Sequence, residues 1–161
     1  MSEGRQTPRT LVIAELGENH VGDMARARQM VIEAAGAGAD FIKVQSFLAS
    51  EVHDGDPEKE WFAQVQLPDA MHAELKQLAE AHGAAFLSAP FSLNRARFLC
   101  EELGLRAIKI ASSELLNFPL LDYVAQHAET VFLSTGLATL DEGAEALRHL
   151  ERGPTVYVLH C

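Results

Sequence analysis

Six short apolar runs recur along this chain, and they begin near residues 11, 39, 84, 106, 130 and 155. Helical patterns separate most of these runs from the next one. A continuous apolar run of this length predicts a strand that is covered on both faces. Strands that alternate with helices predict a parallel sheet with right-handed crossovers. The sequence therefore predicts an α/β fold, with one domain over residues 11–161 and a disordered extension over residues 1–10.

Local signals place the five helices that are expected between these strands. Asp23 is a plausible N-cap for the first helix, and Gly36 ends it. Ser92 caps a helix that runs to Gly104, and the sequence TLDE, residues 139–142, matches a capping box.

Residues 47–66 form a connection of about twenty residues without clear periodicity. Loops of this length inside a compact domain are typically functional lids or disordered segments. The sequence leaves a lid and a passive insertion open. Trp61 and Phe62 are expected to anchor this connection to the body of the protein.

Charge and composition limit the partners of the chain. It has 161 residues and a net charge of −10, which argues against a nucleic-acid or anionic-membrane surface. An anionic ligand would therefore need a local basic pocket. No signal-peptide core and no apolar run of membrane-spanning length occurs, and Cys100 and Cys161 form neither a CxxC pair nor a zinc spacing. These features predict a cytoplasmic protein with reduced cysteines and no metal site of its own.

A lysine lies inside the apolar run of residues 107–111. Burying an ammonium group is costly unless an anion pairs with it. Lys109 could form an internal salt bridge with Glu114, or it could bind an anionic ligand. Both explanations are open at this point.

Every predicted strand ends on a polar residue, and in parallel α/β folds these ends form the floor of the active site. Two ammonium groups and several hydroxyls at one mouth would suit a small phosphate or carboxylate ligand. Glu15 is a candidate for acid–base work or for contact with ligand hydroxyls. His20, in the first strand-to-helix loop, could donate to a substrate or hold its loop. The strand-end residues are Glu15, Lys43 with Gln45, Ser88, Lys109 with Ser112, Ser134 with Thr135, and His160.

Several linked segments, in order, resemble the sialic acid synthases and related nonulosonate synthases. IAELGENHVGD resembles the opening motif of that family, a strand glutamate followed by Asn-His-x-Gly. The later blocks are GADFIKVQSF, FLSAPF, IKIASSELLNFPLL, FLSTGLATLDE and YVLHC. The resemblance covers about residues 11–161, which is nearly the whole chain.

The resemblance implies a TIM-type (β/α) barrel, of which about six of the eight units are present. It also implies a transferase that condenses phosphoenolpyruvate with an N-acetylated hexose such as N-acetylmannosamine, in carbohydrate biosynthesis. The complete enzyme would use a divalent metal, Mn or Mg, with ligands outside this chain, and would form a homodimer.

The motifs of the family also assign roles to individual residues. Glu15 and Glu114 would be catalytic, facing the sugar acceptor and the reaction centre. The predicted substrate-binding residues are Lys43, Lys109, Ser112 and Ser134, which would hold the phosphate and carboxylate of phosphoenolpyruvate, together with Gln45, Ser88, Asn117 and His20.

Two departures from the family stand out. Position 89 is alanine where the family usually has a threonine that helps to bind phosphate. The chain also stops at its sixth strand, so the sequence predicts a truncated piece of a synthase. Two other functions stay open: a Schiff-base aldolase that uses Lys43 or Lys109, and a non-catalytic half-barrel that binds a small anion or pairs with a partner.

Overall fold

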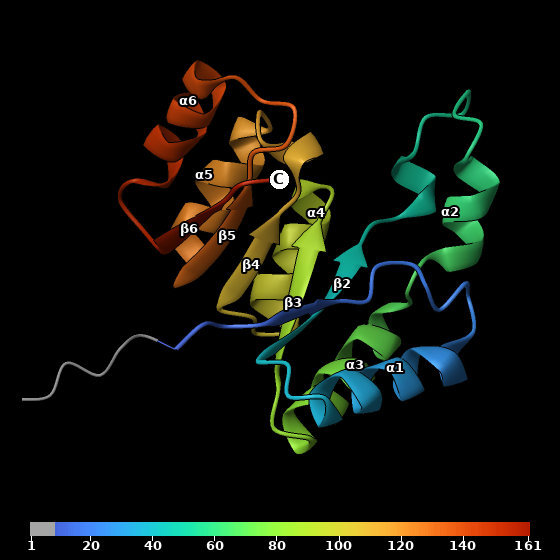
Figure 1. The fold of residues 1–161 in the computed structure, drawn as a ribbon. Helices are drawn as coiled ribbons and strands as arrows, with labels where there is room; N and C mark the ends of the chain where they lie inside the picture. The colour runs from blue at the N-terminus through green and yellow to red at the C-terminus, as the bar shows by residue number, and fades with distance from the viewer. Residues whose placement is uncertain (1–8) are drawn as a thin grey trace, which may run out of the picture.

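The computed structural model describes residues 9–161, which form one parallel sheet flanked by helices (Figure 1). Neighbouring strands follow one another in chain order, as the staves of a barrel do, and the sheet curls into half of a barrel. The α/β prediction with six strand–helix units is confirmed. The strands are β1 (Ile13–Glu15), β2 (Phe41–Ser46), β3 (Ala85–Pro90), β4 (Ala107–Ile110), β5 (Thr130–Ser134) and β6 (Thr155–Leu159).

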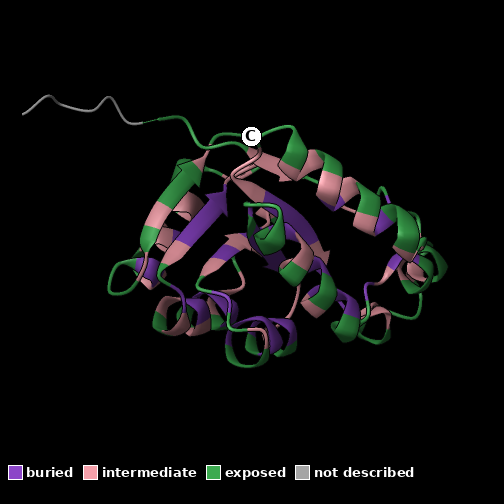
Figure 2. Cartoon of the chain, turned by 90° about the horizontal axis from the view of Figure 1, so that it is seen from below, coloured by how far each residue is buried: buried purple, intermediate pink, exposed green. Residues whose placement is uncertain are grey.

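The helices flank the sheet in pairs: α1 packs against α3, and α5 packs against α6 (Figure 1). Asp23 caps α1 by accepting hydrogen bonds from the backbone N–H groups of Ala25 and Arg26, and Thr139 with Glu142 forms the predicted capping box of α6. The helices turn buried residues toward the sheet and exposed ones outward (Figure 2). Their bounds are α1 (Met24–Gly36), α3 (Asp69–Ala81), α4 (Leu93–Arg97), α5 (Phe118–His127) and α6 (Leu140–Leu150).

The two faces of the sheet differ because successive side chains of a strand point to opposite sides. One set of alternate residues is buried under the helices and forms the hydrophobic core: Ile42, Val44, Ile108, Ile110, Val131 and Leu133. The register places Glu15 beside Lys43, and Lys109 beside Phe132, on the opposite face. The charged residues of the strands therefore share the face that the helices do not cover.

Residues 47–66 contain more regular structure than their sequence predicts. They form the short 3-10 helix η1 (Ala49–Glu51) and the helix α2 (Lys59–Val65), which stands beyond the end of β2 in Figure 1. The Trp61 indole N–H donates to Glu18 Oε2 at 3.1 Å, and the Phe62 ring meets Phe47 edge to face at 5.3 Å. Trp61 therefore anchors the segment to the loop after β1, as predicted. Phe62 packs inside the segment, on Phe47, whose ring in turn meets Phe91 at 6.3 Å.

Gly22 explains how closely this segment approaches the loop that follows β1. Its φ of +78° lies in the left-handed region, and a Cβ atom there would lie 2.5 Å from the backbone oxygen of Gln64. The loop after β1 and helix α2 are thus in direct backbone contact.

Two predicted boundaries differ from the structure. The helix predicted over 92–104 begins as α4 and continues as a π-type segment (Phe98–Glu102), in which the Leu103 N–H reaches back to the Phe98 carbonyl at 2.9 Å. Strand β1 begins only at Ile13, because the Val12 N–H donates to the Asp40 carboxylate at 2.8 Å. The predicted disordered extension falls mostly on residues 1–8, outside the described residues; Arg9 forms an ion pair with Asp40.

Candidate active site

A part-buried ion pair links the end of β1 to the middle of β2. Lys43 Nζ donates to Glu15 Oε1 at 2.6 Å, and the pair follows directly from the parallel register of β1 and β2. Only 6% of the Lys43 side chain is exposed, whereas 56% of the Glu15 side chain is. The ammonium group is therefore held inside the sheet, while the carboxylate reaches solvent.

Lys109, on β4, is a second cation on the same face. Its Nζ donates to the Ile110 carbonyl at 3.2 Å, and it makes no salt bridge with any carboxylate of residues 9–161. Burial lowers the pKa of Lys109, and repulsion by Lys43 lowers it further, against the opposing charge of Glu15. The Lys109–Glu114 salt bridge that the sequence left open is absent among these residues. A half-buried ammonium without a carboxylate partner suits an anionic ligand.

Glu114 lies in the turn after β4, in the short helix η3 (Ser112–Glu114). Its Oε2 accepts a hydrogen bond from Asn117 Nδ2 at 2.9 Å, and its Oε1 lies 3.4 Å from the Ser113 hydroxyl. Asn117 also caps α5, because its Oδ1 accepts from the Leu120 N–H at 3.3 Å. One asparagine thus links the glutamate to the start of a helix.

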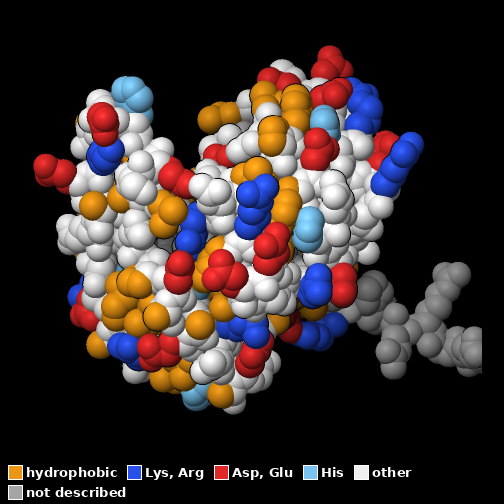
Figure 3. All heavy atoms as spheres, turned by 180° about the vertical axis from the view of Figure 1, so that it is seen from behind, with side chains coloured by type: hydrophobic (Ala, Val, Ile, Leu, Met, Phe, Trp, Pro, Cys, Tyr) orange, Lys and Arg blue, Asp and Glu red, His pale blue; other side chains and the backbone are white. Residues whose placement is uncertain are grey.

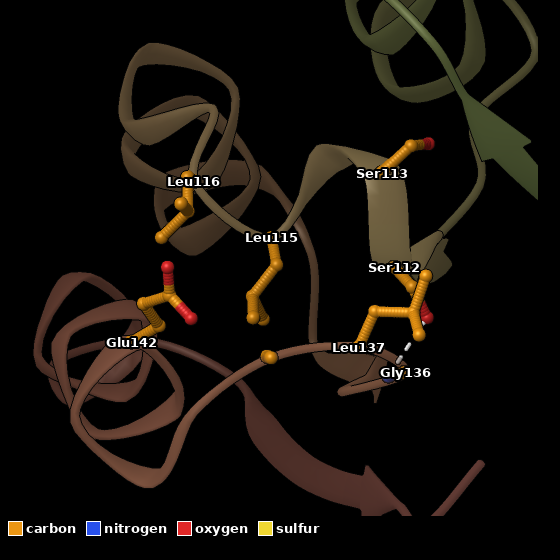
Figure 4. Close-up of a pocket in the computed structure, with 8 residues that line it drawn as sticks. Ser112, Ser113, Leu115, Leu116, Gly136, Leu137 and Glu142 are labelled. Atoms are coloured by element: carbon orange, nitrogen blue, oxygen red, sulfur yellow. Dashed lines mark hydrogen bonds between the residues drawn. The ribbon is translucent and has the colours of Figure 1, made fainter.

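The Ser112 hydroxyl is oriented by a neighbouring loop. The Gly136 N–H donates to Ser112 Oγ at 3.0 Å, as the dashed line in Figure 4 shows. Because the oxygen accepts this bond, the hydroxyl proton is available for a ligand. A side chain at position 136 would interfere, since a Cβ atom there would lie 2.8 Å from Ser112 Oγ.

A pocket of about 310 Å³ opens beside Ser112, a volume typical of small-molecule sites. In Figure 4, Leu115, Leu116 and Glu142 face it from the side opposite to Ser112 and Gly136. Figure 3 also shows the surface hollowed between the arm that carries α2 and the rest of the molecule. Lys43, Lys109 and Glu15 do not line this pocket, so it gives room beside Ser112 only.

An aromatic layer lies in the sheet beneath the charged residues. The Phe41 and Phe132 rings meet edge to face at 5.3 Å, and Phe132 stacks on Tyr157 at 5.3 Å. Phe41 precedes Lys43 by two residues on β2, and Phe132 precedes Ser134 by two on β5, so each aromatic shares a face with the polar residue that follows it. Our sequence reasoning missed this layer, although the spacing of two residues was its signal. The layer keeps the base of the site apolar.

The remaining predicted residues are placed less uniformly. Gln45 and Ser134 lie on the same face as Lys43 and Lys109, and Ala89 is the strand neighbour of Gln45. Ser88 has the opposite parity, so it lies under the helices, fully buried, with its hydroxyl 3.4 Å from the Val44 carbonyl.

His20 is almost fully buried within its own loop, and its Nδ1 accepts a hydrogen bond from the Gly22 N–H at 3.2 Å. Burial lowers the pKa of His20, which favours the neutral ring. Both Ser88 and His20 therefore use a polar atom to bond with the backbone, and contact with a ligand stays a prediction for them.

The described residues do not fit a metal ion. No group of three or more His, Cys, Asp or Glu side chains within residues 9–161 could hold one, and the carboxylate of Glu15 already pairs with Lys43. We therefore derive no step through a metal. Separately, none of the helices in this part of the chain has both the length and the apolar character needed to cross a membrane.

The curled sheet, with its cations and hydroxyls at the carboxyl ends of the strands, defines a partial (β/α) barrel with a site at its mouth. The chain belongs to the NeuB family, whose sequence model matches residues 30–161. The resemblance to the sialic acid and nonulosonate synthases is thereby confirmed.

Two curated relatives and one solved structure illustrate the match. An N,N'-diacetyllegionaminic acid synthase of Campylobacter jejuni is 36% identical over 95% of this chain and 51% of its own length. The Legionella pneumophila synthase of the same name is 32% identical, over 81% of this chain and 41% of its own. The chain thus spans about half the length of the curated relatives it matches. The crystal structure of a sialic acid synthetase from Leptospira borgpetersenii, in complex with citrate, superposes with a TM-score of 0.90 at 28% identity, covering 100% of this chain and 58% of that one.

Proposed function

We propose that this chain forms the phosphoenolpyruvate site of a nonulosonate synthase, which condenses phosphoenolpyruvate with an N-acetylated hexose such as N-acetylmannosamine. The observation that carries the proposal is Lys109, a half-buried cation that has no carboxylate partner among the described residues and lies near Lys43. Phosphoenolpyruvate brings a phosphate and a carboxylate, which such a pair of ammonium groups would bind. The citrate in the Leptospira synthetase is likewise a small carboxylate.

The chemistry of each residue suggests its role in the proposed site. The phosphate and carboxylate are bound by Lys43, Lys109, Ser112 and Ser134. Because Ser112 Oγ accepts a hydrogen bond from the Gly136 N–H, its own proton is free to be donated to the ligand. Phe132, which is buried, places an apolar surface under these groups, and low local polarity strengthens the charged contacts.

Glu15 and Glu114 face the sugar and the reaction centre. In the proposed reaction, C3 of the enol attacks the sugar aldehyde, water attacks C2, and cleavage of the C–O bond releases phosphate. A divalent metal serves the complete synthase, but the residues described here do not form its site. The proposal also includes a cytoplasmic setting and a homodimer for the complete enzyme.

The first experiment measures phosphoenolpyruvate binding by calorimetry. We expect Lys109→Ala to abolish binding while circular dichroism shows the fold retained. Lys76→Ala is the matched control, because Lys76 pairs with Glu80 on the surface of α3, at 2.8 Å. Unchanged affinity in Lys109→Ala would count against the proposed site. Release of phosphate from phosphoenolpyruvate, N-acetylmannosamine and manganese then tests turnover, and binding without release would favour a non-catalytic half-barrel.

One observation favours a second candidate function. The lowered pKa of Lys109 increases the share of neutral amine, which is the form that attacks a carbonyl to make a Schiff base. Borohydride treatment in the presence of pyruvate separates the two functions. A covalent adduct detected by mass spectrometry would identify an aldolase, and its absence together with phosphate release would identify the synthase.

A further inference from the structure

We propose that Asn117 is a positioning residue, which fixes the carboxylate of Glu114 without reacting itself. The inference rests on the proposed function, in which Glu114 faces the reaction centre. The side-chain amide of Asn117 makes two hydrogen bonds: Nδ2 donates to Glu114 Oε2 at 2.9 Å, and Oδ1 accepts from the Leu120 N–H at 3.3 Å.

Glu114 has little else to hold it. Its only other side-chain hydrogen-bond partner within residues 9–161 is the Ser113 hydroxyl, at the long distance of 3.4 Å, and no cation of this part of the chain forms a salt bridge with it. A glutamate on a short turn has several rotatable bonds, so without a firm partner its carboxylate would sample many positions. Asn117 supplies that partner.

Asn117 is itself fixed by helix α5. As the N-cap residue it is tied to the first turn, and the helix is anchored by Leu120, Leu121 and Val124, all fully buried. The core therefore holds α5 in place, α5 holds Asn117, and Asn117 restricts the carboxylate of Glu114. A displacement of about 1 Å at a reacting group can cost on the order of 100-fold in rate, so this link matters for turnover.

Two substitutions separate the cap from the contact with Glu114. Serine and aspartate both cap helices about as well as asparagine, so Asn117→Ser and Asn117→Asp keep the start of α5 and remove only the amide donor. We expect kcat to fall about 10- to 100-fold in both variants, with KM for phosphoenolpyruvate and the melting temperature unchanged. In Asn117→Asp alone, two neighbouring carboxylates would share a proton, so the acid limb of the pH profile should move to higher pH.

The chain offers a matched control. Asn94 Nδ2 donates to Glu51 Oε1 at 2.8 Å, the same chemical pair on an exposed surface, where it joins α4 to η1. Asn94→Ser and Asn94→Asp should leave kcat and the pH profile as in the parent. Parental kcat in both Asn117 variants, or an equal loss in the Asn94 variants, would overturn the inference.

A readout without turnover keeps this inference separate from the proposed function. In a ¹⁵N-labelled sample, we expect the side-chain amide resonances of Asn117 to move when Glu114 is changed to Ala, while the backbone amides of α5 stay in place. Absence of turnover in the parent would remove the proposed function and leave this contact standing. Asn117 side-chain resonances that are identical in the parent and in Glu114→Ala would remove the positioning role.

Discussion

Lys43 Nζ lies 2.6 Å from Glu15 Oε1, and the two partners differ sharply in exposure, since the lysine is buried and the glutamate reaches solvent. The cation is fixed inside the sheet, whereas the carboxylate can turn away. An incoming anion would therefore compete with Glu15 for Lys43. In the proposed function, Glu15 would therefore limit how tightly the site holds an anion and would also supply a carboxylate for the chemistry.

This competition predicts the effect of neutralising Glu15. We expect Glu15→Gln to bind phosphoenolpyruvate about 5-fold more tightly, corresponding to about 1 kcal/mol for the removal of one like charge near the site. Turnover should fall, because the acid–base group is lost. Calorimetry measures the first effect, and Glu74→Gln, which alters a surface pair with Arg28, is the control. Weaker binding in Glu15→Gln would show that Glu15 and phosphoenolpyruvate do not compete for Lys43.

Lys109 gives a prediction about pH. Its pKa lies below the ordinary lysine value of 10.5, because burial and Lys43 both disfavour the charged form. An anion requires that charged form, so affinity should be lost as pH rises, beginning at a lower pH than for an ordinary lysine. The measurement is phosphoenolpyruvate affinity between about pH 7.5 and 10.5, where a phosphate ester keeps its second negative charge.

Lys43→Met tests the cause of this shift. Removing the neighbouring cation should weaken binding overall and move the alkaline loss of affinity to higher pH, because the repulsion is gone. A midpoint that stays in place would show that burial alone sets the titration of Lys109.

The sequence was most informative for site residues whose position depends on a single strand. The lysine inside the run 107–111 and the polar ends of β2 and β5 marked a site, since a buried polar group needs a reason. The sequence prediction for Ser88 did not consider which face of the sheet it lies on. Adjacent residues of a strand point to opposite faces, so Ser88 points toward the helices, away from the face of Lys43 and Gln45. Contacts between separate loops, such as Gly136 with Ser112, depend on how two strand ends meet, which no local pattern contains.

The contact between Gly136 and Ser112 makes its own prediction. In Gly136→Ala the new Cβ atom would lie 2.8 Å from Ser112 Oγ, so the hydroxyl must move, and we expect phosphoenolpyruvate affinity to fall about 10-fold, about 1.4 kcal/mol. Gly143→Ala is the matched control, because a Cβ atom there meets nothing within 4 Å and the position lies in α6. That variant should be about 0.5–1 kcal/mol more stable with unchanged affinity. Equal affinity in the two variants would contradict the orienting role of Gly136.

His72 predicts how stability depends on acid. It is fully buried in α3, its Nδ1 lies 3.2 Å from the Pro68 carbonyl, and its Nε2 has no hydrogen-bond partner in the part of the chain that the structure describes. Burial is the main reason that its pKa falls from 6.5 to about 4. Between these values the unfolded chain binds a proton that the folded chain does not, so stability is full above about pH 6.5 and is lost as the pH falls toward 4.

The size of this loss follows from the two pKa values, and a variant isolates it. Between about pH 7.5 and 4.5 the histidine should cost about 2 to 3 kcal/mol of unfolding free energy. His72→Leu removes the titration, so its stability, measured by urea unfolding, should fall by that much less than the parent's over the same interval. His82→Leu, at the exposed C-cap of the same helix, controls for loss of a histidine in general. Because carboxylates titrate equally in all three proteins, a parallel decline of His72→Leu and the parent would show that the buried ring does not carry the acid sensitivity.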